Sequence, residues 1–445
     1  MIRSAHVVLR RLRAVLALAV IGGSSVAAAA GLPPGSVAER IFSAAPARLL
    51  QIRTLVTGAG RQTSTGSGFV VDANGLAITN YHVVSQVALD PKTYELEYIA
   101  GDGNRGSVKL LAIDLANDLA VVRIDKRDTP FFAFDEETGA PGPQKGERLY
   151  SMGNPLDLGF TIVEGTYNGL VERSYNERIH FTGALNPGMS GGPAVTAEGQ
   201  VVGINVAKRM GSELVSFLVP ARFAAALLRH ARHDAGEPMT DFRSEIGRQL
   251  AAWQSGLYKS VDQSGFRSVA FGPYQGPETK ALWFTCWAQT NAGAVPKPRA
   301  SVNSTNCFSG SRLFVASDLT TGLVQLSHSY VRTVDLNQFQ FANFLSQQSQ
   351  PRLVGGGTVR KWYTPQRCHD DFVVTSASHD RPALRVTWCA QAYREFGGLY
   401  DVAVIAVTED RGDEALVSRL SLQAVGYADA MALGRRFIEA IRWTR

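Results

Sequence analysis

Three short segments in the first half of the chain carry residue types that together can perform nucleophilic chemistry. One ends in Thr-Asn-Tyr-His at His82, one runs Asp-Leu-Ala-Val from Asp118, and one is Gly-Met-Ser-Gly-Gly-Pro around Ser190. A serine hydroxyl needs a base to become a nucleophile, and histidine suits this role because its pKa lies near neutrality. A carboxylate orients the imidazole and stabilises its charged form. The sequence therefore predicts Ser190 as the nucleophile, His82 as the general base and Asp118 as the orienting carboxylate.

The glycines beside the serine predict how the same loop stabilises a developing negative charge. Gly188 and Gly191 let the backbone turn sharply and leave N–H groups that can point at an oxyanion. We expect the backbone N–H groups of Gly188 and Ser190 to form this oxyanion hole.

Short strands separated by Gly, Asn, Asp and Pro must position these segments. The predicted strands are Leu49–Val56, Gly68–Val71, Leu76–Thr79, Leu119–Ile124, Arg148–Met152 and Val201–Val206. Many short strands with turn signals indicate an all-β barrel or sandwich. A run rich in alanine and leucine from Pro220 to His230 predicts a closing helix. Asp118 is favoured over the nearby Asp114 because it directly precedes an apolar strand.

The three segments, in the order His, Asp, Ser, resemble the chymotrypsin-fold serine proteases and, among these, the bacterial HtrA/Deg-type proteases of the periplasm. The resemblance extends from about Gly66 to Pro220 and includes the family's Gly-Asn-Pro and Gly-Ile-Asn stretches. It implies an all-β double β-barrel (chymotrypsin-like) protease domain. It also implies a catalytic triad of His82, Asp118 and Ser190 that hydrolyses peptide bonds through an acyl-enzyme.

Two features depart from the family's pattern. Met189 stands before the nucleophile, where most such proteases have Asn or Asp and where trypsin-like zymogens pair an Asp with a freed N-terminus. Met189 cannot form that ion pair, so other contacts must order the oxyanion loop. After residue 232 no PDZ-type carboxylate-binding loop is recognisable, so the resemblance does not imply the regulation of the HtrA proteases.

The resemblance also assigns three residues to the specificity pocket. It maps the floor of the pocket to Ala184, six residues before the nucleophile, and its walls to Val215 and Ser216. An Asp at the floor would select Lys or Arg, and Ala184 cannot do so. We expect a preference for small or medium apolar side chains before the cleaved bond. The preference should be broad, because one methylene shifts discrimination by only about 1–3 kcal/mol.

Other function classes fit the sequence less well. The Gly-x-Ser-x-Gly pattern around Ser190 also occurs in α/β-hydrolases, but that fold orders its triad Ser, Asp, His and needs a helix directly after the serine. A catalytically weak or inactive protease-fold binding or chaperone-like protein is the alternative, since an oxyanion loop misformed around Met189 would lose much of the rate. No nucleotide fingerprint or metal-ligand spacing is present, so we expect no cofactor and no metal, with proteins or peptides as substrates.

The N-terminal residues predict export. Residues 1–30 combine four arginines up to Arg13, a short apolar run from Ala14 to Ile21 and small residues ending at Ala30. This is the pattern of a secretory signal peptide, and the apolar run is too short to span ~30 Å of hydrocarbon. These arginines supply four of the six net positive charges, so the remainder gives no sign of nucleic-acid binding. We expect a periplasmic or secreted protein with no membrane anchor after signal cleavage.

The cysteines mark a C-terminal region of separate character. We expect the protease domain over residues 31–232, a linker with a short helix (about Thr240 to Trp253) over residues 233–265, and a β-rich α+β domain over residues 266–445. An exported protein meets an oxidising compartment, so two disulfides are expected there. Equal spacing within each pair favours Cys286–Cys307 and Cys368–Cys389 over the other two pairings.

The C-terminal region carries no recognisable motif that would indicate its role. Helical periodicity returns at about Leu336–Gln348 and Ala428–Ile441. Four tryptophans are expected to pack against the disulfides in a small core: Trp283, Trp287, Trp362 and Trp388. We hypothesise that the region recruits substrates or partners for the protease.

Overall fold

The computed structural model describes residues 36–134, 142–208, 214–233, 239–351, 360–373 and 381–444. The predicted signal peptide, residues 1–30, lies outside the described residues. Among the residues described, no helix is both long enough and apolar enough to cross a membrane. The described chain begins with a short helix, α1 (Val37–Ser43), and a 3₁₀ turn at Pro46–Arg48.

A closed antiparallel barrel of six strands carries His82 and Asp118. Its strand order is β1-β2-β3-β6-β5-β4. The strands are β1 (Leu49–Val56), β2 (Arg61–Val70), β3 (Leu76–Thr79), β4 (Tyr94–Ala100), β5 (Arg105–Asp114) and β6 (Leu119–Ile124). Buried apolar side chains such as Ile52, Val70 and Val122 fill its interior. Helix α2 (Tyr81–Leu89) follows β3 and contains His82 near its start, and Asp118 lies directly before β6.

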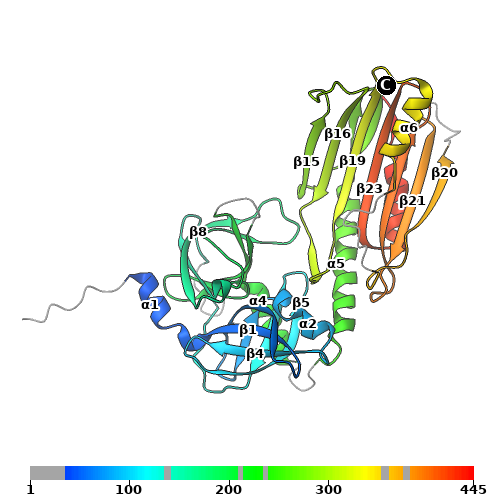
Figure 1. Ribbon diagram of the computed structural model, residues 1–445. Helices are drawn as coiled ribbons and strands as arrows, with labels where there is room; N and C mark the ends of the chain where they lie inside the picture. Colours follow the sequence, from blue (N-terminus) through cyan, green and yellow to red (C-terminus); the bar gives the residue numbers. More distant parts are fainter. Residues whose placement is uncertain are drawn as a thin grey trace, which may run out of the picture. The chain divides into compact units, whose positions relative to one another are not determined.

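A second closed six-stranded barrel carries Ser190. Its strand order is β10-β11-β12-β9-β8-β7. The strands are β7 (Arg148–Gly153), β8 (Thr161–Leu170), β9 (Ile179–Thr182), β10 (Pro193–Val195), β11 (Val201–Lys208) and β12 (Ser216–Pro220), with a 3₁₀ turn at Pro155–Asp157. Figure 1 shows the barrels around the labels β1 and β8. The expected double β-barrel is confirmed, and the α/β-hydrolase alternative is excluded.

Helix α4 (Ala221–His233) follows β12 of the second barrel, close to where the sequence predicts a helix. Its apolar face belongs to a buried cluster that also contains Ile78 of the first barrel and Ile204 of the second. Ala224 and Leu228 are the helix residues most deeply buried in this cluster. The two barrels therefore share a core, which holds their facing loops together.

The segment predicted as a linker is mostly helix. Helix α5 (Phe242–Ser264) has 23 residues, and the side chain of Asp241 caps its first turn. The helix extends well beyond Trp253, the predicted end. Leu257 and Val261 lie in this extension and are buried in the cluster beneath the C-terminal sheet. Their burial stabilises the part of α5 after Trp253, where polar residues do not predict a helix.

The C-terminal region is built on a seven-stranded antiparallel sheet with the order β15-β16-β19-β23-β22-β21-β20 (Figure 1). Its strands are β15 (Phe284–Thr290), β16 (Ala300–Ser309), β19 (Val324–Thr333), β20 (Arg367–Val373), β21 (Leu384–Ala392), β22 (Leu399–Thr408) and β23 (Glu414–Gly426). A smaller sheet contains β13 (Phe266–Phe271), β14 (Tyr274–Thr279) and β24 (Arg442–Trp443), and a hairpin contains β17 (Leu313–Ala316) and β18 (Leu319–Thr321). Helices α6 (Gln338–Gln348) and α7 (Tyr427–Glu439) complete the expected β-rich α+β region.

One disulfide lies at each edge of the large sheet. Cys286–Cys307 joins β15 to β16, and Cys368–Cys389 joins β21 to β20. In both hairpins the two cysteines occupy directly opposed positions. These are the pairings that the equal spacing favours.

The four tryptophans do not form one core with the disulfides. Trp287 is 60% exposed, because β15 is an edge strand with most of its residues in solvent. Trp362 is buried in a different cluster and stacks on Phe396. The expectation of a single disulfide-tryptophan core is therefore corrected.

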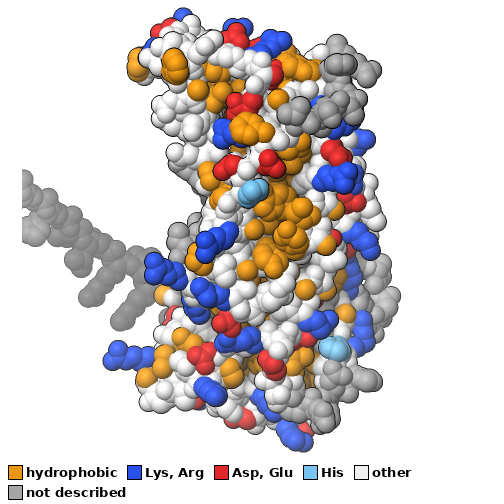
Figure 2. All heavy atoms as spheres, turned by 90° about the vertical axis from the view of Figure 1, so that its right-hand side faces the viewer, with side chains coloured by type: hydrophobic (Ala, Val, Ile, Leu, Met, Phe, Trp, Pro, Cys, Tyr) orange, Lys and Arg blue, Asp and Glu red, His pale blue; other side chains and the backbone are white. Residues whose placement is uncertain are grey.

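The charged side chains on the face shown in Figure 2 are mixed in sign. Lysine and arginine side chains lie among aspartate and glutamate side chains over most of this face. This distribution agrees with the near balance of charge outside the first thirty residues.

Candidate active site

The start of helix α2 is tied to the loop that precedes β6. The side-chain Nδ2 of Asn80 donates a hydrogen bond to the backbone oxygen of Asp118 at 2.7 Å, and the backbone N–H of Tyr81 donates to the same oxygen at 3.1 Å. Asp118 adopts a left-handed backbone conformation with φ 58°. Asp tolerates this conformation better than most residues. The local sequence thus suits the turn that brings Asp118 to the helix.

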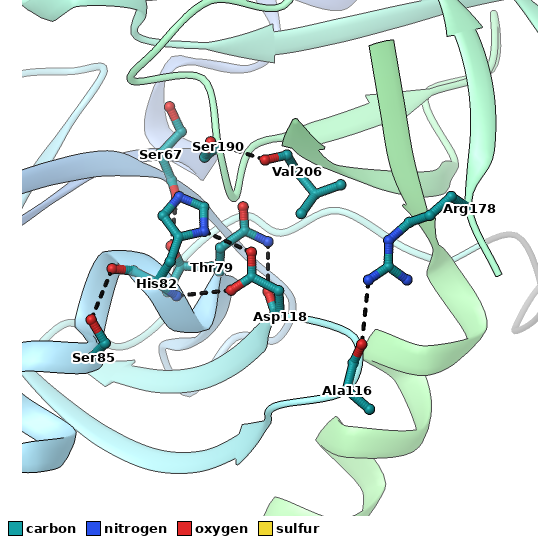
Figure 3. A network of polar contacts seen from close by, with 10 residues as sticks. Ser67, Thr79, His82, Ser85, Ala116, Asp118, Arg178, Ser190 and Val206 are labelled. Atoms are coloured by element: carbon teal, nitrogen blue, oxygen red, sulfur yellow. Dashed lines mark hydrogen bonds and ion pairs between the residues drawn. The ribbon is translucent and has the colours of Figure 1, made fainter. Parts of the chain in front are cut away.

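The carboxylate of Asp118 binds His82 through two different nitrogen atoms (Figure 3). One oxygen accepts the backbone N–H of His82 at 2.8 Å, and the other lies 2.6 Å from the ring Nδ1. Because an ionised carboxylate only accepts, Nδ1 carries the proton and Nε2 is left to take another. The rival carboxylate, Asp114, instead accepts both the backbone and side-chain N–H groups of Asn117.

The electrostatic surroundings of His82 favour its charged form. Burial lowers the pKa of His82, but the negative charge of Asp118 and its hydrogen bond outweigh burial and leave that pKa raised. The N-terminus of α2 favours a negative charge at Asp118. The His82 side chain is still 29% exposed, so a reacting group can reach it.

Arg178 supports the loop that carries Asp118. Its guanidinium donates to the backbone oxygen of Ala116 at 3.3 Å (Figure 3). It also donates to the side-chain oxygen of Asn117 at 3.5 Å. Burial lowers the pKa of Arg178, and the charges of Asp118 and Asp114 act in the opposite direction. Arg178 precedes β9 of the second barrel, so it links the two barrels beside the site.

At two positions of the loop around Ser190, only glycine fits the backbone conformation and the space. Gly188 has φ 94°, and a Cβ there would lie 2.4 Å from the backbone oxygen of Asn154. Gly191 has φ 88°, and a Cβ there would lie 2.2 Å from the backbone oxygen of Ser67. The glycines therefore allow a close approach between the serine loop and neighbouring backbone.

Two backbone N–H groups of this loop are free to bind an anion. Within the described part of the chain, neither Gly188 nor Ser190 donates its backbone N–H to an acceptor. The preceding carbonyl, that of Pro187, accepts the N–H of Leu156 at 2.9 Å. The structure thus leaves unpaired the two groups that the sequence assigns to an oxyanion hole.

The Ser190 hydroxyl is turned away from the imidazole. It donates to the backbone oxygen of Val206 at 3.5 Å (Figure 3). No hydrogen bond joins it to His82 among the described residues. A rotation about the Cα–Cβ bond is needed to direct the hydroxyl at Nε2, and such bonds often tighten only when substrate binds.

Apolar packing and two polar side chains order the serine loop. Met189 is 1% exposed and lies in a cluster with Phe181 and Leu218 of the second barrel. Asn205 Nδ2 donates to the backbone oxygen of Met189 at 3.1 Å. The hydroxyl of Ser67 donates to the backbone oxygen of Gly188 at 2.7 Å. Met189 is thus an apolar anchor, and no ion pair is needed at its position.

The sequence does not by itself identify Ser67 and Asn205 as residues that order the serine loop. Both lie within stretches that resemble the protease family, Ser67 in the Gly-Ser-Gly that begins at Gly66 and Asn205 in the Gly-Ile-Asn that begins at Gly203. Ser67 stands between two glycines in strand β2, which is a signal of a close backbone contact, whereas Asn205 carries no such signal. Their partners lie far away in the chain, so the sequence does not identify them.

The residues assigned to the specificity pocket have different environments. Ala184 is exposed and Val215 is half-buried. Ser216 is 1% exposed, and its hydroxyl donates to the backbone oxygen of Gly183 at 2.7 Å. Ser216 thus holds the segment beside Ala184 in place.

Metal ligation has one geometric candidate among the described residues. Glu278, Cys286 and Cys307 have ligand atoms within 4.8 Å of one another. Both sulfur atoms belong to a disulfide, so they offer no thiolate. This cluster does not fit a metal site.

Part of the chain matches a family of known proteins. Residues 66–204 match the family described as "Trypsin-like peptidase domain". The chain therefore contains a trypsin-like peptidase domain related to the DegP/HtrA serine proteases.

The relatives align with part of the chain. The chain is 32% identical over 172 residues to a putative serine protease HhoB of Synechocystis. This match covers 37% of this chain and 39% of that protein. It is 34% identical over 176 residues to a probable periplasmic serine endoprotease DegP-like of Brucella suis, covering 38% of this chain and 33% of that protein. The chain thus spans less than half the length of these relatives. A serine endoprotease structure from Yersinia pestis aligns with a TM-score of 0.39 at 24% identity, over 46% of this chain and 69% of that one.

Proposed function

We propose that this protein is an exported serine endopeptidase that hydrolyses peptide bonds through His82, Asp118 and Ser190. The observation that carries the proposal is the double contact of the Asp118 carboxylate with His82, at 2.8 Å to the backbone nitrogen and 2.6 Å to Nδ1. This contact fixes both the position and the tautomer of the ring. The related proteins named above are serine proteases, which supports the same reaction.

The proposed reaction proceeds through an acyl-enzyme. His82 Nε2 takes the proton of Ser190 as the hydroxyl oxygen attacks the peptide carbonyl carbon. The carbonyl oxygen becomes an oxyanion, which the N–H groups of Gly188 and Ser190 stabilise. Protonated His82 then gives its proton to the leaving amine as the C–N bond breaks. A water molecule, deprotonated by His82, hydrolyses the acyl-enzyme and restores Ser190.

The preference of the enzyme is proposed to be for small or medium apolar side chains before the cleaved bond. Support comes from Ala184, Val215 and Ser216, none of which carries a charge that would select Lys or Arg. The Ser216 hydroxyl already donates its hydrogen bond to the backbone oxygen of Gly183, so it is not available to donate to a substrate. A peptide-library cleavage profile tests this proposal, and dominant cleavage after Lys or Arg would contradict it.

The alternative is a protease-fold binding protein with weak or no activity. The observation that favours it is the Ser190 hydroxyl, which donates to Val206 and not to His82. Peptide cleavage by the folded wild type, lost in Ser190→Ala, separates the two functions. The proposal expects cleavage by the wild type only, whereas binding of unfolded protein without any cleavage would support the alternative.

We also propose that the protein is exported, to the periplasm or beyond. The pattern of residues 1–30 and the periplasmic naming of related proteins support this location. Fractionation of cells that express the full chain, with N-terminal sequencing of the mature protein, tests it. Retention of the intact N-terminus in the cytoplasm would contradict export.

A further inference from the structure

The β17–β18 hairpin of the C-terminal region lies against the helix that carries His82. Val37–Arg445 form one compact unit, and a single buried cluster within it contains Tyr81 and Val84 of α2 together with Leu313 and Val315 of β17. The hydroxyl of Tyr81, which is fully buried, donates to the backbone oxygen of Val315 at 2.8 Å. The residue next to His82 is therefore held by a strand that lies 234 residues away along the chain.

Phe314 is the hairpin residue that reaches the imidazole. Its neighbours Leu313 and Val315 are buried, while Phe314 itself is only partly buried. Its ring lies edge-on to His82 with a centroid distance of 5.9 Å and an interplanar angle of 69°. It also contacts Tyr81 edge-on at 6.3 Å. Phe314 thus presents a partly exposed aromatic surface beside the partly exposed His82 ring.

The hairpin is fixed to the rest of the C-terminal region. The hydroxyl of Tyr393 donates to Asp401 at 2.7 Å and lies 2.8 Å from the hydroxyl of Thr321 at the end of β18. All three side chains are buried. Gly322 follows with φ 90°, and a Cβ there would lie 2.7 Å from the ring of Trp253. Buried contacts on the side of the C-terminal region therefore hold the hairpin whose Phe314 lies beside His82.

The bond that is cleaved has to lie next to the His82 imidazole, and Phe314 contacts that imidazole. The peptide carbonyl carbon has to reach Ser190, and the leaving nitrogen has to reach Nε2 of His82 for proton transfer. A side chain next to the cleaved bond therefore lies close to the imidazole. Phe314 offers that side chain an apolar contact, whereas water would surround it otherwise.

We propose that Phe314 forms an apolar substrate subsite beside His82, so that the C-terminal region supplies part of the substrate cleft. The inference rests on the proposed peptidase function. It gives the C-terminal region a direct role in selecting residues near the cleaved bond, beyond any recruitment of whole substrates. The substrates it favours have an apolar side chain at one position flanking the cleaved bond.

The test compares peptide-library cleavage by the full-length wild type, Phe314→Ala and Phe314→Leu. Ser317→Ala is the matched control, because Ser317 lies in the exposed turn of the same hairpin. A small fluorophosphonate that labels serine nucleophiles reports on Ser190 independently of the subsite. We expect Phe314→Ala to lower kcat/KM about 10-fold or more for peptides with a bulky apolar residue at one flanking position. For peptides with Gly or Ala at that position, kcat/KM should change little, and so should the rate of labelling. Phe314→Leu should have intermediate values of kcat/KM. Ser317→Ala should match the wild type.

Three results separate failure of the subsite from failure of the enzyme. If the wild type is labelled and cleaves peptides while Phe314→Ala keeps the same profile, the subsite is overturned and the peptidase function stands. A uniform fall for all peptides and for labelling in both Phe314 variants also overturns the subsite, because it shows a structural effect on His82. A folded wild type that neither labels nor cleaves overturns the proposed function and the inference together.

Discussion

The carboxylate of Asp118 accepts one hydrogen bond from the backbone of His82 and a second from its ring, at 2.8 Å and 2.6 Å. The first bond caps the start of helix α2, and the second orients the imidazole. One side chain therefore sets both the position of the helix and the tautomer of its histidine. A change at Asp118 should alter orientation and proton affinity together.

Asp118→Asn should lower kcat/KM about 10⁴-fold, because an amide cannot hold the Nδ1–H tautomer as a carboxylate does. Since Asp118 raises the pKa of His82, the variant should also move the acid limb of residual activity to lower pH. In the wild type, activity requires neutral His82 and should fall as pH drops through a pKa above 6.5. A pH series of kcat/KM measures both effects.

Asp114→Asn is the matched control for this change. Asp114 contacts Asn117 and not His82, so its variant should keep most of the activity and the position of the acid limb. An equal loss in both variants would contradict the assignment of Asp118 as the orienting carboxylate.

Arg178→Gln removes a positive charge that interacts with Asp118. With less positive charge beside the site, the pKa of His82 should rise further. The acid limb of kcat/KM should therefore move to higher pH, opposite to the shift in Asp118→Asn. Loss of the bonds to Ala116 and Asn117 should also lower kcat. An acid limb that stays in place would argue against an electrostatic link between Arg178 and the site.

Met189→Asp should disrupt the oxyanion loop. Met189 is buried among apolar side chains, and an unpaired carboxylate there would cost several kcal/mol. Thermal unfolding should begin at lower temperature, and fluorophosphonate labelling of Ser190 should slow. Met189→Leu keeps the apolar contact and should behave nearly as the wild type. Faster labelling in Met189→Asp would show that the loop uses an ion pair after all.

Asp401→Asn should change how stability of the C-terminal region depends on pH. Burial raises the pKa of Asp401 to about 6 and lowers the pKa of His328 to about 4. The raised pKa of Asp401 contributes to the free energy of unfolding at low pH, and this contribution is lost as pH rises through about 6. The His328 contribution is present above about 6.5 and lost as pH falls through about 4. Each contribution to the free energy of unfolding amounts to roughly 3 kcal/mol. In the wild type the two contributions change in opposite directions as pH rises from about 4 to about 6.5.

Denaturant unfolding from pH 4 to pH 6.5 measures this balance. Asp401→Asn removes one contribution, so its unfolding free energy should rise with pH relative to that of the wild type. Asp318→Asn, in an exposed turn, is the control and should run parallel to the wild type. Parallel curves for Asp401→Asn and the wild type would contradict a buried carboxyl with a raised pKa.

Local patterns are enough to predict the strands that position the site. The predicted strands Leu49–Val56, Leu76–Thr79 and Leu119–Ile124 coincide with β1, β3 and β6, because buried apolar runs bounded by turn residues define them. Equal spacing favours the disulfide pairing that the structure has, because two cysteines opposed in a hairpin need only a suitable loop length. These features depend on neighbours in the chain.

Features that depend on distant partners could not be predicted. Helix α5 continues past Trp253 because Leu257 and Val261 meet the C-terminal sheet, which the local sequence does not specify. The contact of Phe314 with His82 depends on how the C-terminal region packs on α2. The cysteines and composition of that region predict a separate module, whereas the buried cluster that joins β17 to α2 brings it to the site.

Covalent labelling of Ser190 tests the central claim most directly. The folded, full-length protein is treated with a fluorophosphonate, and intact mass with peptide mapping identifies the modified residue. We predict one adduct, on Ser190, absent in Ser190→Ala and formed far more slowly in His82→Ala, with a rate that rises with pH through the pKa of His82. A folded wild type that forms no adduct at Ser190 across this pH range would contradict the proposed peptidase.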